Sequence, residues 1–205
     1  MTGIFKSTIL MTLFFLATHA HCQEALKPAH DWKLPLDTKS RKDLASIRWG
    51  TNGDFLSRRN RHLHTGIDFV NLGSHEKVYA AASGKVVSVY AREPNKSVMV
   101  EHRLPSGEIV WTVYVHVTDV KVKRGESVTS DTVIAHLMSK VQLNIYGWHF
   151  NHLHFEVLKK PRITKDGKYL SYSTWCKTED EVERRFHNPV AFFIELWALE
   201  KQKSQ

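Results

Sequence analysis

The sequence predicts a mainly β, single-domain protein that ends in a short C-terminal helix. The stretch from about 67 to 137 is rich in valine and aromatic residues and is interrupted by glycine and proline, as strands and their turns are. Helix signals appear only from about residue 178 onward. The 205 residues are enough for one domain with a sizeable core, and contents of 42% hydrophobic and 24% charged residues argue against a disordered or membrane-spanning chain.

The N-terminus has the pattern of a secretory signal. Lys6 is the only charged residue before the apolar run 9–16, which is far shorter than the roughly 20 residues that span a bilayer. Small residues follow, with cleavage sites predicted after Ala20 or after Cys22. We therefore expect residues 1–22 to be a signal peptide, no transmembrane segment, and a mature protein that is periplasmic or extracellular.

The two cysteines leave several alternatives open. Cys22 is either removed with the signal peptide or retained, and a retained Cys22 could carry a lipid. Cys176 is then either a lone thiol or the disulfide partner of Cys22 in an oxidising compartment. In neither case does the fold depend on a disulfide network.

The chain is basic, which favours an anionic partner. Its net charge is +8, and loss of Lys6 with the signal leaves 28 basic against 21 acidic side chains, or +7. Nucleic acid is not predicted as a partner, because we find no recognition helix, zinc-finger spacing or RNP-like aromatic strand. For an exported protein an acidic cell wall or a membrane surface fits better, and solubility alone would also explain the charge.

Turn and cap residues mark a hairpin and two helices. The sequence LPSG at 104–107 predicts a turn between strands near 97–103 and 108–118. Thr178 with Glu181 forms a capping-box pattern that predicts a first helix. A second helix is predicted from the sequence NPVAFFIELWALEKQK, which offers Asn188 as N-cap, Pro189 at the first helical position and lysines at the end.

Two strand-like stretches place histidines on one face, because successive side chains of a strand point to opposite faces. In the stretch NHLHFEV the apolar face is Leu153, Phe155 and Val157, and the polar face is His152, His154 and Glu156. In VYVHVT we expect Val113, Val115 and Val117 opposite Tyr114, His116 and Thr118. If only one such stretch were present, its histidine could simply be buried in the core. Two matching stretches suggest instead that their histidines converge on one site.

His64 and Asp68 are four residues apart around Gly66. A helix would put them on one face, but the intervening residues are poor helix formers in combination. A straight strand would hold them about 13 Å apart, too far for one metal ion. We therefore expect a bend at Thr65 and Gly66, which glycine permits.

Together these motifs predict a metal site. His64, Asp68 and one histidine of the stretch 151–157 would provide two nitrogens and one oxygen, a set that suits Zn²⁺ and leaves a fourth position for water. The other histidine of that stretch and His116 would remain free for proton transfer or oxyanion stabilisation, which predicts a hydrolase site. Glu156 would either orient a ligand or be a solvated strand carboxylate.

The blocks HTGIDF, VYAAASGKVVSV, YVH, HLHFEV and NPVAFF, in this order, resemble the lysostaphin-like (LytM-type) zinc metallopeptidases, which cut peptide cross-links of bacterial peptidoglycan. The resemblance covers about 30–196, and WKLPL and IRWGTNGDF upstream are also similar. It implies a single antiparallel β-sheet domain of the lysostaphin/LytM (duplicated hybrid motif) type over 23–196, followed by a C-terminal tail at 197–205.

The resemblance also implies residue roles. His64, Asp68 and His154 match the zinc ligands of the family, one ion per chain. His116 and His152 match its catalytic histidines, whose roles the sequence does not divide.

The expected function is that of a secreted zinc endopeptidase that cuts peptidoglycan cross-links through a zinc-activated water. The D,D-bond is the favoured target and a glycyl bridge the next choice. No regulatory protein partner is identified by the sequence. One alternative is a non-catalytic LytM-like module that binds the wall and activates another wall hydrolase, although such modules lack zinc ligands. Another is a basic wall-binding protein with a purely structural metal site.

Three departures from the family pattern concern the expected surroundings of the site. The sequence LMSKVQLNIYGWHFN stands where the family has a glycine-rich loop, and IAHL stands where it commonly has an Ile-Gly pair. Residues 158–187 form an insertion before NPVAFF. We expect all three to border the cleft, and so to affect substrate preference more than metal binding.

Overall fold

The computed structural model describes residues 25–37, 40–46, 48–49, 53–70, 72–170 and 176–203. The predicted signal peptide 1–22, including Cys22, lies outside these residues. Cys176 is buried and forms no disulfide within them, and burial raises the pKa of its thiol. No helix in this part of the chain has the length and apolar character needed to cross a membrane.

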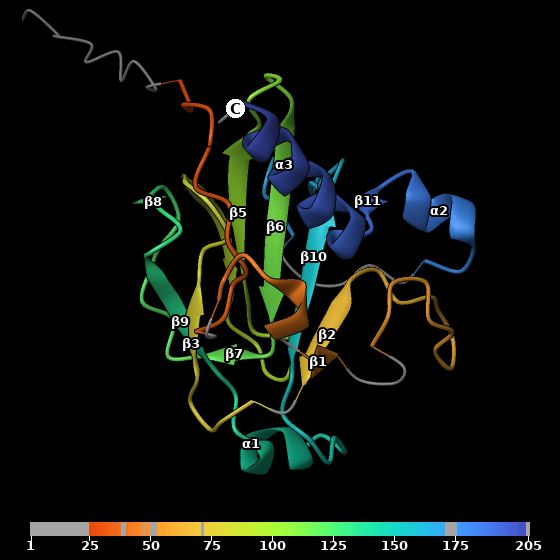
Figure 1. Ribbon diagram of the computed structural model, residues 1–205. Helices are drawn as coiled ribbons and strands as arrows, with labels where there is room; N and C mark the ends of the chain where they lie inside the picture. Colours follow the sequence, from red (N-terminus) through yellow and green to blue (C-terminus); the bar gives the residue numbers. More distant parts are fainter. Residues whose placement is uncertain are drawn as a thin grey trace, which may run out of the picture.

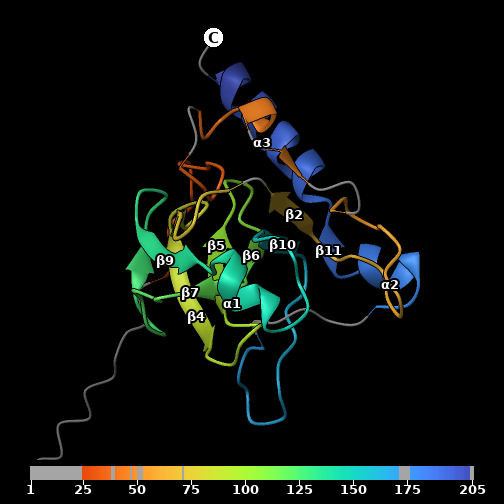
Figure 2. The ribbon, with the colours of Figure 1, turned by 90° about the horizontal axis from the view of Figure 1, so that it is seen from below.

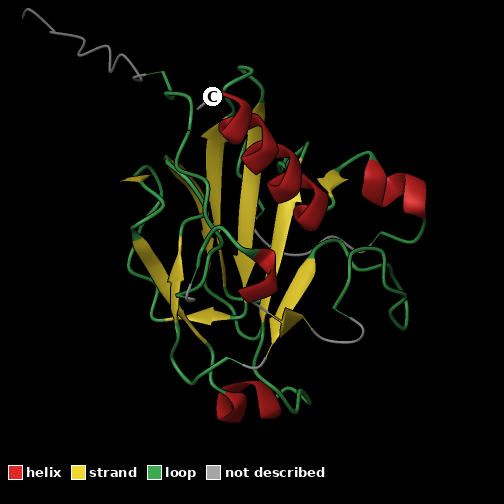
Figure 3. Cartoon of the chain, viewed as in Figure 1, coloured by secondary structure: helices red, strands yellow, loops and turns green. Residues whose placement is uncertain are grey.

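Two antiparallel sheets form the body of the protein (Figures 1 and 3). The larger sheet has the order β1-β2-β10-β6-β5-β4-β8, with β11 also paired to β10. Its strands are β1 (Arg48–Trp49), β2 (Ile67–Val70), β4 (Gly84–Tyr90), β5 (Ser97–Arg103), β6 (Ile109–Val115), β8 (Ser127–Val128), β10 (Leu153–Leu158) and β11 (Phe186–His187). The smaller sheet contains β3 (Lys77–Tyr79), β9 (Val133–Leu137) and β7 (Val117–Thr118). A short 3₁₀ helix, η1, spans Leu44–Ser46.

The predicted fold class is therefore confirmed: the chain is mainly antiparallel β with a C-terminal helix. The predicted hairpin is also confirmed, because β5 and β6 pair from Ser97 with Val115 to Arg103 with Ile109. Its turn needs a glycine, since Gly107 has a positive φ of 94°.

Helix α2 (Glu179–Glu183) begins at the predicted capping box of Thr178 and Glu181. Helix α3 (Pro189–Lys203) begins as predicted, with the Asn188 side chain accepting a hydrogen bond from the backbone N–H of Val190 at 3.0 Å. Helix α3 continues through Lys203, beyond the predicted domain boundary at 196.

Helix α1 (Lys140–Asn144) was not predicted, since helix signals were expected only near the C-terminus. It is short, and its start is a capping box between Ser139 and Gln142. This helix lies in the segment where the family pattern has a glycine-rich loop, at the lower end of the molecule in Figure 1.

One face of β10 belongs to the core. Leu153, Phe155 and Val157 are fully buried there, as the alternation predicted. Helix α3 covers this face, with the ring of Phe193 stacked 6.0 Å from that of Phe155 (Figure 1). The opposite face of β10 carries His154 and Glu156, followed by Leu158, which is buried in a second hydrophobic cluster.

The alternation predicted for 113–118 is wrong after Val115. Val113 and Val115 share one hydrophobic cluster, but Val117 lies in the other cluster, together with Tyr114. The cause is His116, which has a positive φ of 68° and ends β6, so that the chain passes to β7 in the smaller sheet. His116 therefore does not share a strand face with Tyr114.

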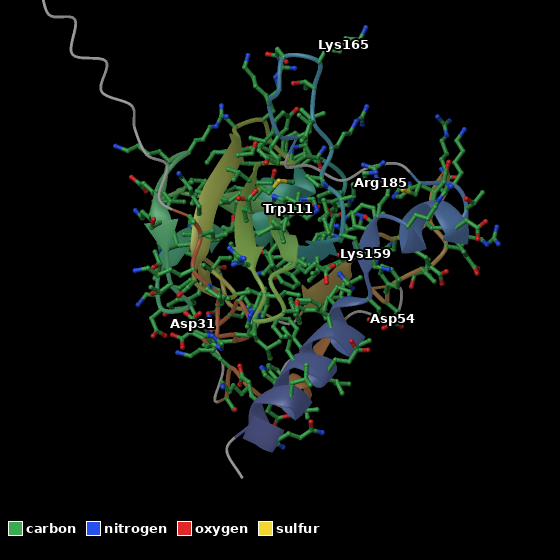
Figure 4. The ribbon with its side chains drawn as sticks, turned by 90° about the horizontal axis from the view of Figure 1, so that it is seen from above. Asp31, Asp54, Trp111, Lys159, Lys165 and Arg185 are labelled. Carbon is green, nitrogen blue, oxygen red and sulfur yellow. The ribbon has the colours of Figure 1, made fainter. Side chains whose placement is uncertain are left out.

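The insertion 158–187 starts at the end of β10 and includes a hairpin, helix α2 and strand β11. Lys165 is at the tip of the hairpin, which projects from the sheet (Figure 4). Strand β11 pairs back onto Val157 and Leu158 of β10. The backbone N–H of Leu63 donates to the carbonyl of Cys176 at 2.8 Å, which brings the insertion beside the segment that carries His64.

Candidate metal centre

Strand pairing brings two of the three predicted ligands, Asp68 and His154, together. In the antiparallel pair of β2 and β10, Asp68 is directly opposite His154. Opposed residues present their side chains on the same face, and Nδ1 of His154 lies 2.9 Å from Oδ1 of Asp68. Their neighbours Phe69 and Phe155 point into the core on the other face.

His64 reaches the same point through a bend at Gly66, as predicted. Its Nε2 lies 3.0 Å from Oδ1 of Asp68 and 2.8 Å from Nδ1 of His154. The reason for the glycine differs from the one expected. A Cβ at Gly66 would lie 2.2 Å from the carbonyl oxygen of Phe155, so the glycine allows the chain to pass against β10.

The residues His64, Asp68 and His154 fit a zinc ion. Their ligand atoms lie within 4.8 Å of one another, and all three side chains are buried. Two imidazole nitrogens and one carboxylate oxygen are a common set for a zinc ion that keeps an open coordination position. No other group of three or more metal-binding side chains occurs among the residues that the structure describes.

Hydrogen bonds behind the ligands orient both imidazoles. Nδ1 of His64 donates a hydrogen bond to the carbonyl of Asp54 at 2.8 Å. The lone pair of its Nε2 therefore faces the centre. In His154 the arrangement is reversed: Nε2 lies 3.1 Å from Oε1 of Glu156, and Nδ1 faces the centre. Partners of this kind fix the orientation of histidine ligands in metal sites.

Glu156 is buried, with 1% of its surface exposed, so the interpretation of a solvated carboxylate is wrong. Its Oε1 accepts a hydrogen bond from the hydroxyl of Thr65 as well as contacting His154. The register explains why: Glu156 shares the polar face of β10 with His154, and Thr65 comes from the bent segment that crosses this face.

Charges in the centre are strongly coupled. Burial alone would raise the pKa of Asp68, but its contacts with the imidazoles of His154 and His64 outweigh burial and hold this pKa well below the usual value. Burial would lower the pKa of His154, yet Asp68 and Glu156 raise it to about 9. A proton thus occupies His154 at neutral pH, and a bound metal cation would replace it.

His116 and His152 lie beside the three ligands but outside the cluster. Their rings are 4.6 Å apart, and the ring of His116 is 6.3 Å from that of His154. The left-handed backbone of His116 turns its ring toward this site, away from the side chain of Tyr114 in the core. Nδ1 of His116 donates to the carbonyl of Pro94 at 2.7 Å, which leaves its Nε2 as a proton acceptor.

Both of these histidines are neutral at pH 7. Burial lowers the pKa of His152 to about 4. Burial and then the neighbouring His152 hold the pKa of His116 well below its usual value. A neutral imidazole can accept a proton at one nitrogen and donate a hydrogen bond from the other, as general acid–base chemistry requires.

Two neighbours of the site were missed by the sequence analysis. Nη2 of Arg59 donates to Oδ2 of Asp68 at 2.7 Å, but nothing in the run SRRNRH distinguishes this arginine from its neighbours. The ring of Trp148 lies 4.3 Å from His116 and 5.2 Å from His152, in the segment that departs from the family pattern. The contact of Trp148 with the two histidines supports the expectation that this segment borders the site.

Comparison with known families gives one match. The sequence model of peptidase family M23 matches residues 62–169, which include His64, Asp68, His116, His152 and His154. No match was found among curated protein sequences.

Solved structures resemble the fold. The antimicrobial peptidase lysostaphin from Staphylococcus simulans has a TM-score of 0.52 and 19% identity, over 83% of this chain and 56% of that one. A zinc-containing peptidase from Vibrio cholerae has a TM-score of 0.44 and 24% identity, over 64% of this chain and 37% of that one. The chain thus spans little more than half the length of this lysostaphin structure.

Proposed function

The chain belongs to peptidase family M23, and from this premise we propose that it is a zinc metallo-endopeptidase that hydrolyses the peptide cross-links of bacterial peptidoglycan. One observation carries the proposal: three buried ligand atoms converge beside two neutral histidines that are not part of the cluster. A structural metal site would have no need of the two additional histidines.

In this proposal each residue of the site has a task. His64, Asp68 and His154 hold zinc, which when bound supplies Lewis-acid polarisation of a carbonyl and a water of lowered pKa. One of the pair His116 and His152 accepts the proton of the attacking water, and the other donates a hydrogen bond to the developing oxyanion or protonates the leaving amine. The hydrogen bond from Nδ1 of His116 to Pro94 favours Nε2 as the proton-accepting atom of that residue.

Charge and the predicted export signal support the substrate assignment. The expected mature charge of +7 would attract the protein to the anionic sacculus, and a signal peptide at 1–22 would place it in the periplasm or outside the cell. Within peptidoglycan we propose the D,D-bond of the peptide cross-link as the target, with a glycyl bridge as the alternative.

Digestion of purified sacculi tests this function. The wild-type protein and the variant His152→Ala are incubated with sacculi, and the muropeptides are then separated. We expect cross-linked dimers to convert to monomers with the wild type only. Persistence of dimers with a folded, zinc-bound wild-type protein would contradict the endopeptidase assignment and favour a non-catalytic module that activates another wall hydrolase.

Glu156 is expected to support zinc binding from behind His154. Glu156→Gln keeps the size of the side chain but removes the carboxylate that faces Nε2 of His154 and the Thr65 hydroxyl. We expect zinc affinity to fall about 10- to 100-fold, the usual effect of losing such a partner. Competition with a chelator measures the affinity, and Glu108→Gln, at an exposed position, is the control. Equal affinities in the two variants would show that Glu156 has no such role.

A further inference from the structure

Arg59 lies in a segment whose backbone forms hydrogen bonds with the backbone of two predicted ligands, His64 and Asp68. The backbone N–H of Asp68 donates to the carbonyl of Gly53, and that of His64 donates to the carbonyl of Ser57, both at 2.9 Å. The next turn is closed by a hydrogen bond from the N–H of Arg59 to the carbonyl of His62 at 2.9 Å. These hydrogen bonds fix the backbone of Arg59 beside the metal centre.

The carboxylate of Asp68 is divided between two environments. Oδ1 faces Nε2 of His64 and Nδ1 of His154, whereas Oδ2 accepts a hydrogen bond from Nη2 of Arg59 at 2.7 Å. Within the described residues, no other hydrogen bond reaches Oδ2. The pair is largely sheltered, with 27% of the Arg59 side chain and 9% of the Asp68 side chain exposed.

We propose that Arg59 is a positioning residue for the metal centre: it holds Oδ2 of Asp68 so that Oδ1 alone is presented to the metal. The proposal rests on the zinc site of the proposed function. A charge-assisted hydrogen bond to one oxygen prevents the carboxylate from rotating or from binding the ion with both oxygens. It thereby protects the open coordination position that a hydrolytic zinc site needs.

The positive charge of Arg59 gives the proposal a sharp test, because charge and positioning act in opposite directions. A guanidinium beside a cation site repels the metal, so removal of the charge alone would tighten zinc binding. Loss of a residue that orients a ligand typically weakens metal binding about 10- to 100-fold. The sign of the change therefore identifies which effect dominates.

The experiment measures the zinc dissociation constant of the full chain by competition with a chromogenic chelator. We expect Arg59→Gln and Arg59→Ala each to raise it about 10- to 100-fold. Arg59→Lys should recover most of this loss, because a single N–H contact is what Oδ2 accepts. Arg61→Gln removes an exposed arginine of the same turn and should leave the constant unchanged. Circular dichroism of the metal-free variants checks that they are folded.

Unchanged or tighter zinc binding in folded Arg59→Gln or Arg59→Ala would overturn the proposal, and so would an equal loss in Arg59→Lys. The outcome is separable from that of the proposed function. A wild-type protein that binds zinc but does not cut sacculi would refute the proposed function. The zinc dissociation constants of the Arg59 variants would still decide the role of Arg59. A wild type that binds no zinc would refute both.

Discussion

His64→Ala, Asp68→Ala and His154→Ala are each expected to lose most of the bound zinc and all measurable hydrolysis of sacculi. Each substitution removes one of the three proposed protein ligands, so the loss in affinity should exceed the roughly 10- to 100-fold effect of an indirect partner. Mass spectrometry measures the zinc content of each purified protein, and we expect about one zinc per wild-type chain.

The exposed His30 provides the matched control for these substitutions. His30→Ala also deletes an imidazole, and it should retain full zinc content and activity. Full zinc occupancy in any one of the three ligand variants would remove that residue from the metal centre. Because their side chains are buried, each variant must also be shown to be folded.

Substitution of His116 or His152 is expected to separate metal binding from turnover. Both variants should keep zinc, because neither imidazole belongs to the ligand cluster. Turnover should fall by at least about 10²-fold, the usual scale for loss of a proton-transfer group or an oxyanion donor. Initial rates on cross-linked muropeptides, together with zinc content, test the separation.

The backbone at His116 dictates the choice of variant. Its positive φ of 68° is a conformation that asparagine tolerates better than alanine. His116→Asn should therefore preserve the turn from β6 to β7 while removing the imidazole, and His152→Ala serves at the other position. Near-normal rates in both folded variants would assign the two histidines a structural role only.

The convergence of His64, Asp68 and His154 was partly predictable from strand geometry, whereas the choice of His154 over His152 rested on the family resemblance. Alternation in the stretch NHLHFEV correctly separated the core residues from His152, His154 and Glu156. The bend at Gly66 was predictable from the spacing of His64 and Asp68, since the intervening residues disfavour a helix and a straight strand would hold the two side chains too far apart for one ion. The direct pairing of Asp68 with His154 depends on the register of β2 and β10, which one strand alone does not specify.

Other features depended on contacts between distant parts of the chain. The position of His116 was predicted on the wrong basis, because alternation assumes a regular strand and His116 has a left-handed backbone. The burial of Glu156 depends on Thr65, and the contact of Arg59 depends on a turn whose arginines look equivalent in the sequence. Helix α1 has a capping box of its own, but five residues give too short a pattern to recognise against the surrounding strands.

A crystal structure of the zinc-loaded protein, with anomalous diffraction measured at the zinc edge, tests the central claim most directly. We predict one zinc peak, bound by Nε2 of His64, Oδ1 of Asp68 and Nδ1 of His154 at about 2.0–2.2 Å, with His116 and His152 not coordinated. A peak located elsewhere, or one coordinated by His116 or His152, would contradict the account.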